Sequence, residues 1–183
     1  ARNGRQRPSL VEVPKDVFRE EIDEIEYAPT SSARSAPDPN AIPEIVDVLL
    51  DAHDPVINAG QGVHYAEAWD ELQELAELLE APVATTLNGK SAFPEDHPLS
   101  LGAGSKSEPR ALNRFLERAD VVFGIGCSFT TTAYGITMPD GKTVIHSTLD
   151  AGDIDKDVES DYSLVGDAKL TLAAIVDEVR ERL

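Results

Sequence analysis

The chain has 183 residues, 41% of them hydrophobic, so it can bury one core without disulfides or a metal. Its 34 acidic residues against 16 Lys and Arg give a formal charge of −18, which argues against nucleic acids and anionic membranes as partners. The single cysteine excludes an internal disulfide framework, and without a signal peptide or a membrane-length apolar run we expect a cytoplasmic protein.

The acidic residues are spread along the chain rather than gathered in one tail, and lysine is scarce. A spread acidic surface poor in lysine is typical of proteins from salt-loving organisms, where salt screens the repulsion between like charges. The alternative is an ordinary acidic cytosolic domain. We expect the halophilic origin.

The first residues indicate a domain boundary. Pro8–Val17 is expected to form a short strand, and Ser31–Pro37 is a linker by composition because it is rich in Ser, Ala and Pro. A strand followed directly by a linker is typical of the tail of a preceding domain. We therefore predict that residues 1–39 end one domain and that residues 40–183 form the next.

From Asn40 onward, helical patterns alternate with short apolar runs. Asn40 is expected to cap the first helix, and a long helix from His64 to Glu80 is expected to bury Tyr65 and Trp69. A helix follows Pro109, and Asp167 is expected to cap the last one. Strands are predicted at Pro55–Ala59, Pro82–Thr86, near Leu101, Val121–Ile125, Thr143–Thr148 and Tyr162–Val165. The alternation predicts an α/β fold, a doubly wound parallel sheet of five to six strands with helices on both faces.

Two glycine turns are candidate binding elements. Gly60-Gln61-Gly62 follows the first strand, and Gly124-Ile125-Gly126 ends the strand of the second half. In a doubly wound sheet both turns line the crevice at the topological switch point, where backbone N–H groups could hold a phosphate. The equally weighted alternative is that the glycines only make tight turns. The third glycine of the dinucleotide fingerprint is replaced by Tyr65, which disfavours a nicotinamide oxidoreductase.

Other reactive residue types give weak signals. The four histidines share no metal-ligand spacing, so no metal site is expected. Cys127 is interpreted as a small residue at a tight turn rather than a nucleophile. The run Thr130–Thr132 could either donate hydrogen bonds to a ligand or cap a helix.

One long stretch carries a family resemblance. Residues 83–102, VATTLNGKSAFPEDHPLSLG, closely resemble the central domain of acetolactate-synthase-like enzymes that depend on thiamine diphosphate (ThDP). Further segments agree with the same family, and the resemblance runs from Pro8 to the last helix. These segments are Leu10–Val17, Ala119–Gly126, Val144–Asp150 and Val165–Ala168.

The resemblance implies a three-domain parent enzyme. Its pyrimidine-binding and diphosphate-binding domains hold ThDP and Mg²⁺ between them, usually across a subunit interface of a homo-oligomer, and the cofactor attacks a 2-oxo acid. The catalytic glutamate of the first domain and the diphosphate motif of the third are not found in this sequence. The chain is therefore expected to be a structural central domain of a lyase or carboligase, with no catalytic residue and no activity alone.

The resemblance also assigns the crevice. In acetolactate synthases the central domain binds FAD, and in some decarboxylase relatives it is empty or holds ADP. The alternative function is thus an FAD- or ADP-binding module that regulates or stabilises the parent, ahead of a free-standing NAD oxidoreductase. At Gly126–Thr132 this sequence differs from the FAD-binding pattern, because two arginines and two acids are replaced. The assigned residues are Gly60, Gln61, Gly62, Thr86, Leu87, Gly126, Ser128, Asp150, Gly166 and Asp167.

Overall fold

The computed structural model describes residues 4–29, 31–105 and 109–183, and its contacts divide the chain into two units, Ala1–Arg34 and Ser35–Leu183. The described part of the first unit has one short 3-10 helix, η1 (Val17–Arg19), and no strand. The strand predicted over Pro8–Val17 is therefore wrong in this structure, since an isolated strand has no neighbour to take its backbone hydrogen bonds. No helix in the described ranges is long and apolar enough to span a membrane.

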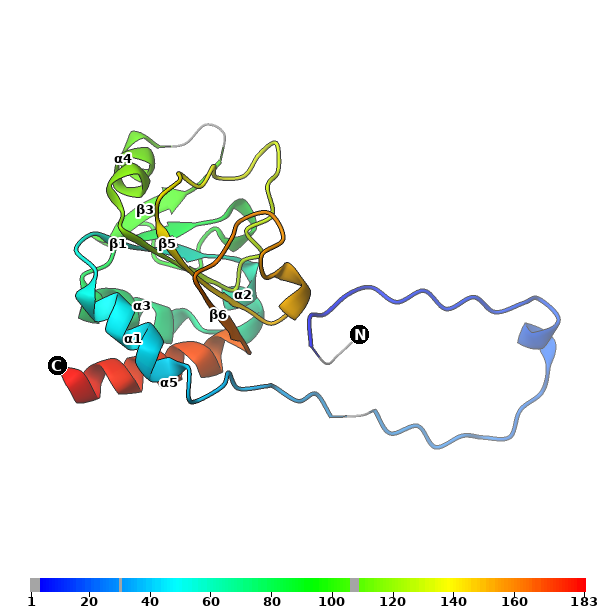
Figure 1. The fold of residues 1–183 in the computed structure, drawn as a ribbon. Helices are drawn as coiled ribbons and strands as arrows, with labels where there is room; N and C mark the ends of the chain where they lie inside the picture. Colours follow the sequence, from blue (N-terminus) through cyan, green and yellow to red (C-terminus); the bar gives the residue numbers. More distant parts are fainter. Residues whose placement is uncertain (1–3, 30, 106–108) are drawn as a thin grey trace. The chain divides into compact units, whose positions relative to one another are not determined.

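The second unit is built on an all-parallel sheet of six strands in the order β3-β2-β1-β4-β5-β6 (Figure 1). This confirms the predicted doubly wound sheet, and the order reverses between β1 and β4, which places the topological switch point there. The strands are β1 (Pro55–Ala59), β2 (Val83–Thr85), β3 (Ser100–Ala103), β4 (Val121–Ile125), β5 (Thr143–Thr148) and β6 (Tyr162–Val165).

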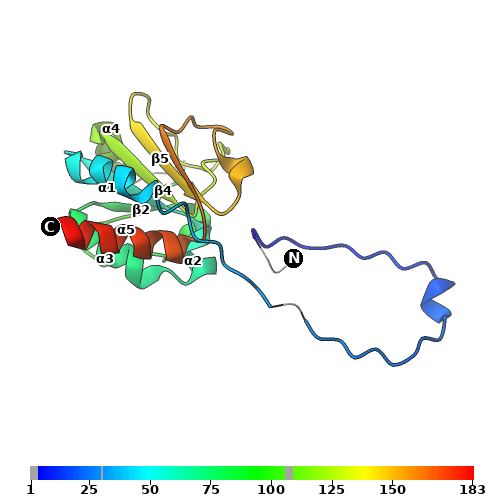
Figure 2. The same ribbon diagram turned by 60° about the horizontal axis from the view of Figure 1, so that its bottom comes forward.

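Helices cover both faces of the sheet, as predicted. The helices are α1 (Ile42–Asp51), α2 (Gln61–Ala66), α3 (Trp69–Leu79), α4 (Arg110–Arg118) and α5 (Ala168–Arg182), with short 3-10 helices η2 (Leu87–Gly89) and η3 (Ala151–Asp153). On one face α5 packs against both α1 and α3 (Figure 2). On the other face α4 covers the sheet together with the irregular segment 126–142, which connects β4 to β5 without a helix.

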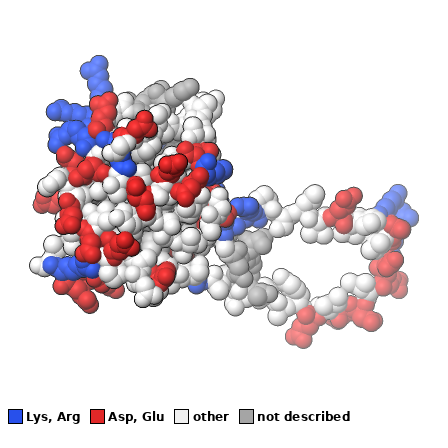
Figure 3. Space-filling view, in the orientation of Figure 1, with Lys and Arg blue, Asp and Glu red and all other residues white. Residues whose placement is uncertain are grey.

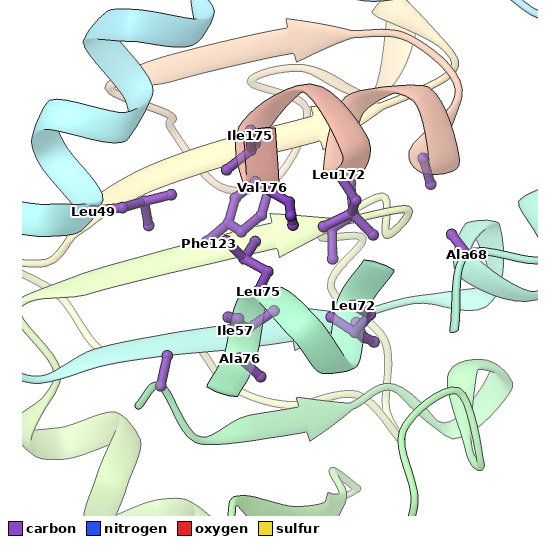
Figure 4. Close-up of a cluster of buried hydrophobic side chains, with 14 of the residues drawn as sticks. Leu49, Ile57, Ala68, Leu72, Leu75, Ala76, Phe123, Leu172, Ile175 and Val176 are labelled. Carbon is purple, nitrogen blue, oxygen red and sulfur yellow. The ribbon is translucent and has the colours of Figure 1, made fainter. Parts of the chain in front are cut away.

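The larger core lies under the three packed helices. Ile57 of β1 and Phe123 of β4 meet Leu75 of α3 and Leu172 of α5, and all four side chains are fully buried (Figure 4). Burying a side chain of this size stabilises a fold by roughly 1.5–3 kcal/mol relative to leaving it exposed. These strands read as continuous apolar runs because a parallel sheet is covered on both faces.

Two predictions about helix boundaries are wrong. The side chain of Asn40 donates to Asp38 Oδ1 instead of capping α1, which begins at Ile42. The helix predicted over 64–80 is two helices, because Glu67 adopts a left-handed conformation at φ 55° that ends α2. The break turns Trp69 outward, and Tyr65 and Trp69 are 60% and 44% exposed rather than buried.

The glycine turns after β1 and β4 lie in direct contact. The N–H of Gly60 donates to the carbonyl of Ile125 at 2.9 Å, and the N–H of Gly62 donates to the carbonyl of Gly126 at 2.8 Å. A Cβ on Gly60 would lie 2.3 Å from the Gly126 oxygen, and a Cβ on Gly62 would lie 2.7 Å from the Gly126 Cα. The contact therefore requires glycine at these positions whether or not a ligand binds, which supports the tight-turn interpretation.

At the amino ends of the strands, the Asp120 carboxylate joins the start of β4 to the turn before β1. It accepts hydrogen bonds from the backbone N–H groups of His53 at 2.7 Å and Asp54 at 2.9 Å. Partial burial acts to raise the pKa of Asp120, but these two N–H donors, together with those of Asp120 itself and Val121, outweigh it and hold the pKa below its ordinary value.

We predict that Gly60→Ala destabilises the domain by roughly 3 kcal/mol, because the new methyl group overlaps backbone that cannot move independently. Gly141→Ala is the matched control: its φ is +74° but nothing lies within 4 Å of the added Cβ. The control should cost only about 1 kcal/mol of left-handed strain. Urea unfolding of both variants measures the difference. Equal stability of the two variants would contradict the close contact between the Gly60 turn and Gly126.

We predict that Asp120→Asn lowers the free energy of unfolding near neutral pH by about 1–2 kcal/mol, because the hydrogen bonds to His53 and Asp54 lose the charge of their acceptor. Since the folded pKa is depressed, this stabilisation is present above the ordinary Asp pKa of about 3.9 and is lost as the pH falls through the folded pKa. Unfolding free energies of wild type and variant, measured over a pH series, should converge in acid. If the difference in unfolding free energy between wild type and variant stays constant down to the lowest pH, the charge of Asp120 does not stabilise the fold.

Candidate functional site

The ten residues assigned to the crevice all follow the carboxyl ends of strands, so the parallel sheet brings them to one edge. Gly60, Gln61 and Gly62 follow β1; Thr86 and Leu87 follow β2; Gly126 and Ser128 follow β4; Asp150 follows β5; Gly166 and Asp167 follow β6. This is the edge at which ligands bind in doubly wound sheets. The candidate residues therefore share one edge of the sheet, but β2 and β6 are four strand positions apart, so those that follow β2 and those that follow β6 are not neighbours.

Three of the polar side chains at this edge cap short or long helices. Thr86 Oγ1 accepts from the N–H of Gly89 at 3.0 Å, which closes η2. Asp150 Oδ1 accepts from the N–H of Gly152 at 3.1 Å, at the start of η3. Asp167 accepts from the first turn of α5, which confirms the predicted cap. Helix capping therefore explains why Thr or Asp stands at these three positions, and no ligand is needed to explain it.

The end of the linker occupies the turn between β6 and α5. The N–H of Asp167 donates to the carbonyl of Ser35 at 2.8 Å, and Pro37 is buried. A Cβ on Gly166 would lie 2.7 Å from the Pro37 nitrogen, so glycine is required here by the linker. This contact joins residues far apart in the sequence, and no local pattern signals it.

The segment after β4 folds back over the sheet through Phe129. This residue adopts a left-handed backbone at φ 45°, and a Cβ on Gly124 would lie 2.3 Å from its ring. The ring also meets His146 of β5 edge-on, with centroids 4.8 Å apart. Thr130–Thr132 caps no helix. The Thr130 hydroxyl shares a hydrogen bond with the Ser128 hydroxyl at 2.8 Å and also accepts one from Lys156 Nζ at 3.5 Å.

Beneath this segment lies a buried polar row that the sequence did not reveal. Asn58, Gly124 and His146 are neighbours across β1, β4 and β5, and the Asn58 amide donates to Cys127 Sγ at 3.7 Å. His146 Nε2 lies 3.0 Å from the Cys127 carbonyl, which can only accept, so Nε2 carries the proton. Burial lowers the pKa of His146, which favours the neutral imidazole.

Cys127 is not suited to nucleophilic chemistry. Its side chain is buried, and desolvation raises the pKa of its thiol to about 12. At neutral pH the thiolate, which is the reactive form, is therefore scarce. The interpretation of Cys127 as a small residue at a tight turn agrees with this environment.

The edge offers little to a diphosphate or a metal. The N–H groups of Gly60 and Gly62 already donate to protein carbonyls, and α2 has only six residues. Among the residues that the structure describes, no three His, Cys, Asp or Glu side chains are grouped to hold a metal ion. The residues present at the glycine turns thus do not fit the anionic group of a bound dinucleotide.

Comparison with known proteins assigns the family. Residues 42–175 match the family model for the central domain of thiamine pyrophosphate enzymes. The chain is 36% identical over 197 aligned positions to the probable acetolactate synthase large subunit of Methanocaldococcus jannaschii, which covers 100% of this chain and 33% of that protein. It is also 36% identical over 185 positions to glyoxylate carboligase of Escherichia coli O157:H7, covering 98% of this chain and 31% of the relative.

Two solved structures are similar in fold. The crystal structure of benzoylformate decarboxylase from Polynucleobacter necessarius superimposes with a TM-score of 0.71 at 29% identity, over 88% of this chain and 31% of that one. A putative thiamin diphosphate-dependent enzyme from Mycobacterium smegmatis superimposes with a TM-score of 0.69 at 28% identity. The chain spans about a third of the length of the curated relatives it matches. The chain belongs to the central-domain family of thiamine pyrophosphate enzymes.

Proposed function

We propose that the chain is the structural central domain of a ThDP-dependent 2-oxo acid lyase or carboligase, and that it does not catalyse alone. Its similarity to acetolactate synthase and glyoxylate carboligase over nearly its whole length supports this parent. The observation that supports a structural role is the contact between Gly60–Gly62 and Gly126. A domain whose switch point is filled by its own backbone is suited to hold neighbouring domains at a fixed spacing.

The partners in this proposal are the other two domains of the parent. Residues 1–39 end the pyrimidine-binding domain and form the linker, and a diphosphate-binding domain completes a cytoplasmic homo-oligomer. Exposed apolar side chains of the first unit support this arrangement, since another domain of the parent would cover them. Leu10 is 93% exposed and Phe18 is 80% exposed. In this proposal ThDP and Mg²⁺ would be held by the other two domains, where the cofactor would supply the electron sink for chemistry on a 2-oxo acid.

The second candidate function, an FAD- or ADP-binding module, would use the ten assigned crevice residues. Seven of them have an intramolecular role. Gly60 and Gly62 donate to carbonyls, one of them that of Gly126, and Gly166 makes room for Pro37. The other three, Thr86, Asp150 and Asp167, each cap a helix. The segment 126–132 supplies no arginine for a diphosphate. These observations favour the structural role over the nucleotide module and over a nicotinamide oxidoreductase.

We predict that FAD, ADP, NAD and ThDP with Mg²⁺ each leave the thermal unfolding midpoint of the chain unchanged. A ligand present at 100 times its Kd would add about 2.7 kcal/mol to the folded state, so a working site is readily detected. The same chain should form no product from a 2-oxo acid with ThDP. A saturable rise in the midpoint with FAD or ADP would instead establish the nucleotide module.

We propose a halophilic origin from the acidic composition, and it gives a separate prediction. With 34 acidic and 16 basic residues, repulsion between carboxylates opposes folding until salt screens it. The unfolding midpoint should therefore rise steeply from low to molar KCl, and an equal osmolality of sucrose, which does not screen charge, serves as the control. A midpoint that is flat in KCl, or that rises equally in sucrose, would argue for an ordinary acidic domain.

A further inference from the structure

The outer surface of α4 is basic although the chain as a whole is strongly acidic. Arg110, Arg114 and Arg118 follow one another at intervals of four residues, so they form a stripe along one side of the helix, and all three are exposed. Figure 3 shows a group of basic side chains where Figure 1 places α4. The first turn of the helix carries no acidic residue.

The stability of the domain does not explain this stripe. Arg118 pairs with Asp54 at 2.9 Å, but Arg110 and Arg114 make no ion pair with any residue in the described ranges. A positive charge in the first turn is also unfavourable to the helix dipole. On α5, by contrast, Lys169 and Arg180 both pair with acids of α3.

An aromatic side chain borders the stripe. Phe115 is 38% exposed, whereas Leu112 and Leu116 of the same helix are buried against the sheet. On a helical projection Phe115 lies between the arginines and the buried side. Arginine beside an exposed aromatic ring is the composition typical of protein interfaces.

A complementary stripe lies on α1. Glu44, Asp47 and Asp51 are exposed at spacings that place them on one side of the helix. Asp47 pairs with Arg182, whereas Glu44 and Asp51 make no ion pair within the described part of the chain. Each stripe is about 10–12 Å long at a rise of 1.5 Å per residue.

The two stripes lie on helices that pack in different cores of one copy. Helix α1 packs in the core under α5, and α4 packs in the separate core on the other face of the sheet. We propose that the α4 surface made by Arg110, Arg114 and Phe115 binds the Glu44–Asp51 stripe on α1 of a second copy. The contact joins two different surfaces, so two copies can form it once, head to tail, or twice about a two-fold axis. Exposed ion pairs are individually weak and are screened by salt, so the association weakens as KCl rises.

Two charge-reversal variants test the contact by sedimentation velocity over a concentration and KCl series, with circular dichroism to verify folding. R110E/R114E makes both stripes acidic, and E44K/D51K makes both stripes basic. Each variant alone should associate at least about tenfold more weakly than the wild-type chain. Mixing the two should restore association with equal amounts of each variant, because each α4 surface then meets an α1 stripe of opposite charge on the other variant.

The control K15E/R19E changes the net charge as much as R110E/R114E does, but in the exposed segment before the domain. It should associate as the wild-type chain does. A wild-type chain that stays monomeric at every concentration, or association that survives both reversals, overturns the proposal. Association that needs the arginines but not the α1 carboxylates also overturns it, and would direct the search to another acidic surface, such as Glu20–Glu26.

Discussion

The turns after β1 and β4 lie so close together that their backbones touch, and the rest of the domain is arranged around this contact. Gly60 and Gly62 donate to carbonyls of the second turn, which fixes where α2 begins. A third turn stacks on the same point, because a Cβ on Gly89 would lie 2.6 Å from the Ala59 oxygen. The switch point of the sheet is therefore a packed junction of three backbone segments.

This junction explains why the chain has the fold of nucleotide-binding domains but lacks the free backbone N–H groups with which such domains bind a phosphate. The strand order and the glycine turns are those of a doubly wound sheet, but the N–H groups of the turns already have acceptors in the protein. Ser35–Pro37 fills the turn before α5, so the linker ends inside the domain and not beside it. Both features suit a rigid spacer within a larger enzyme.

The strands and their alternation with helices could be predicted, because each strand is a short apolar run bounded by Gly, Pro or polar residues, and the Asp167 cap is a local signal. The break at Glu67 could not be predicted, since the apolar periodicity continues through it and glutamate seldom adopts the left-handed conformation that it has here. The roles of Gly60, Gly124 and Gly166 were also out of reach. Each depends on a distant partner, and glycine in a turn has the same local pattern whether it admits a ligand or a neighbouring backbone.

Amide hydrogen exchange followed by NMR tests the closed junction most directly, because it reports on the N–H groups of Gly60 and Gly62 individually. If these groups donate to Ile125 and Gly126, they exchange slowly and their signals stay in place when ADP or FAD is added. Rapid exchange of both amides in the folded domain, or their shift on titration with either nucleotide, would show that the turns are open to a ligand and would contradict the structural role.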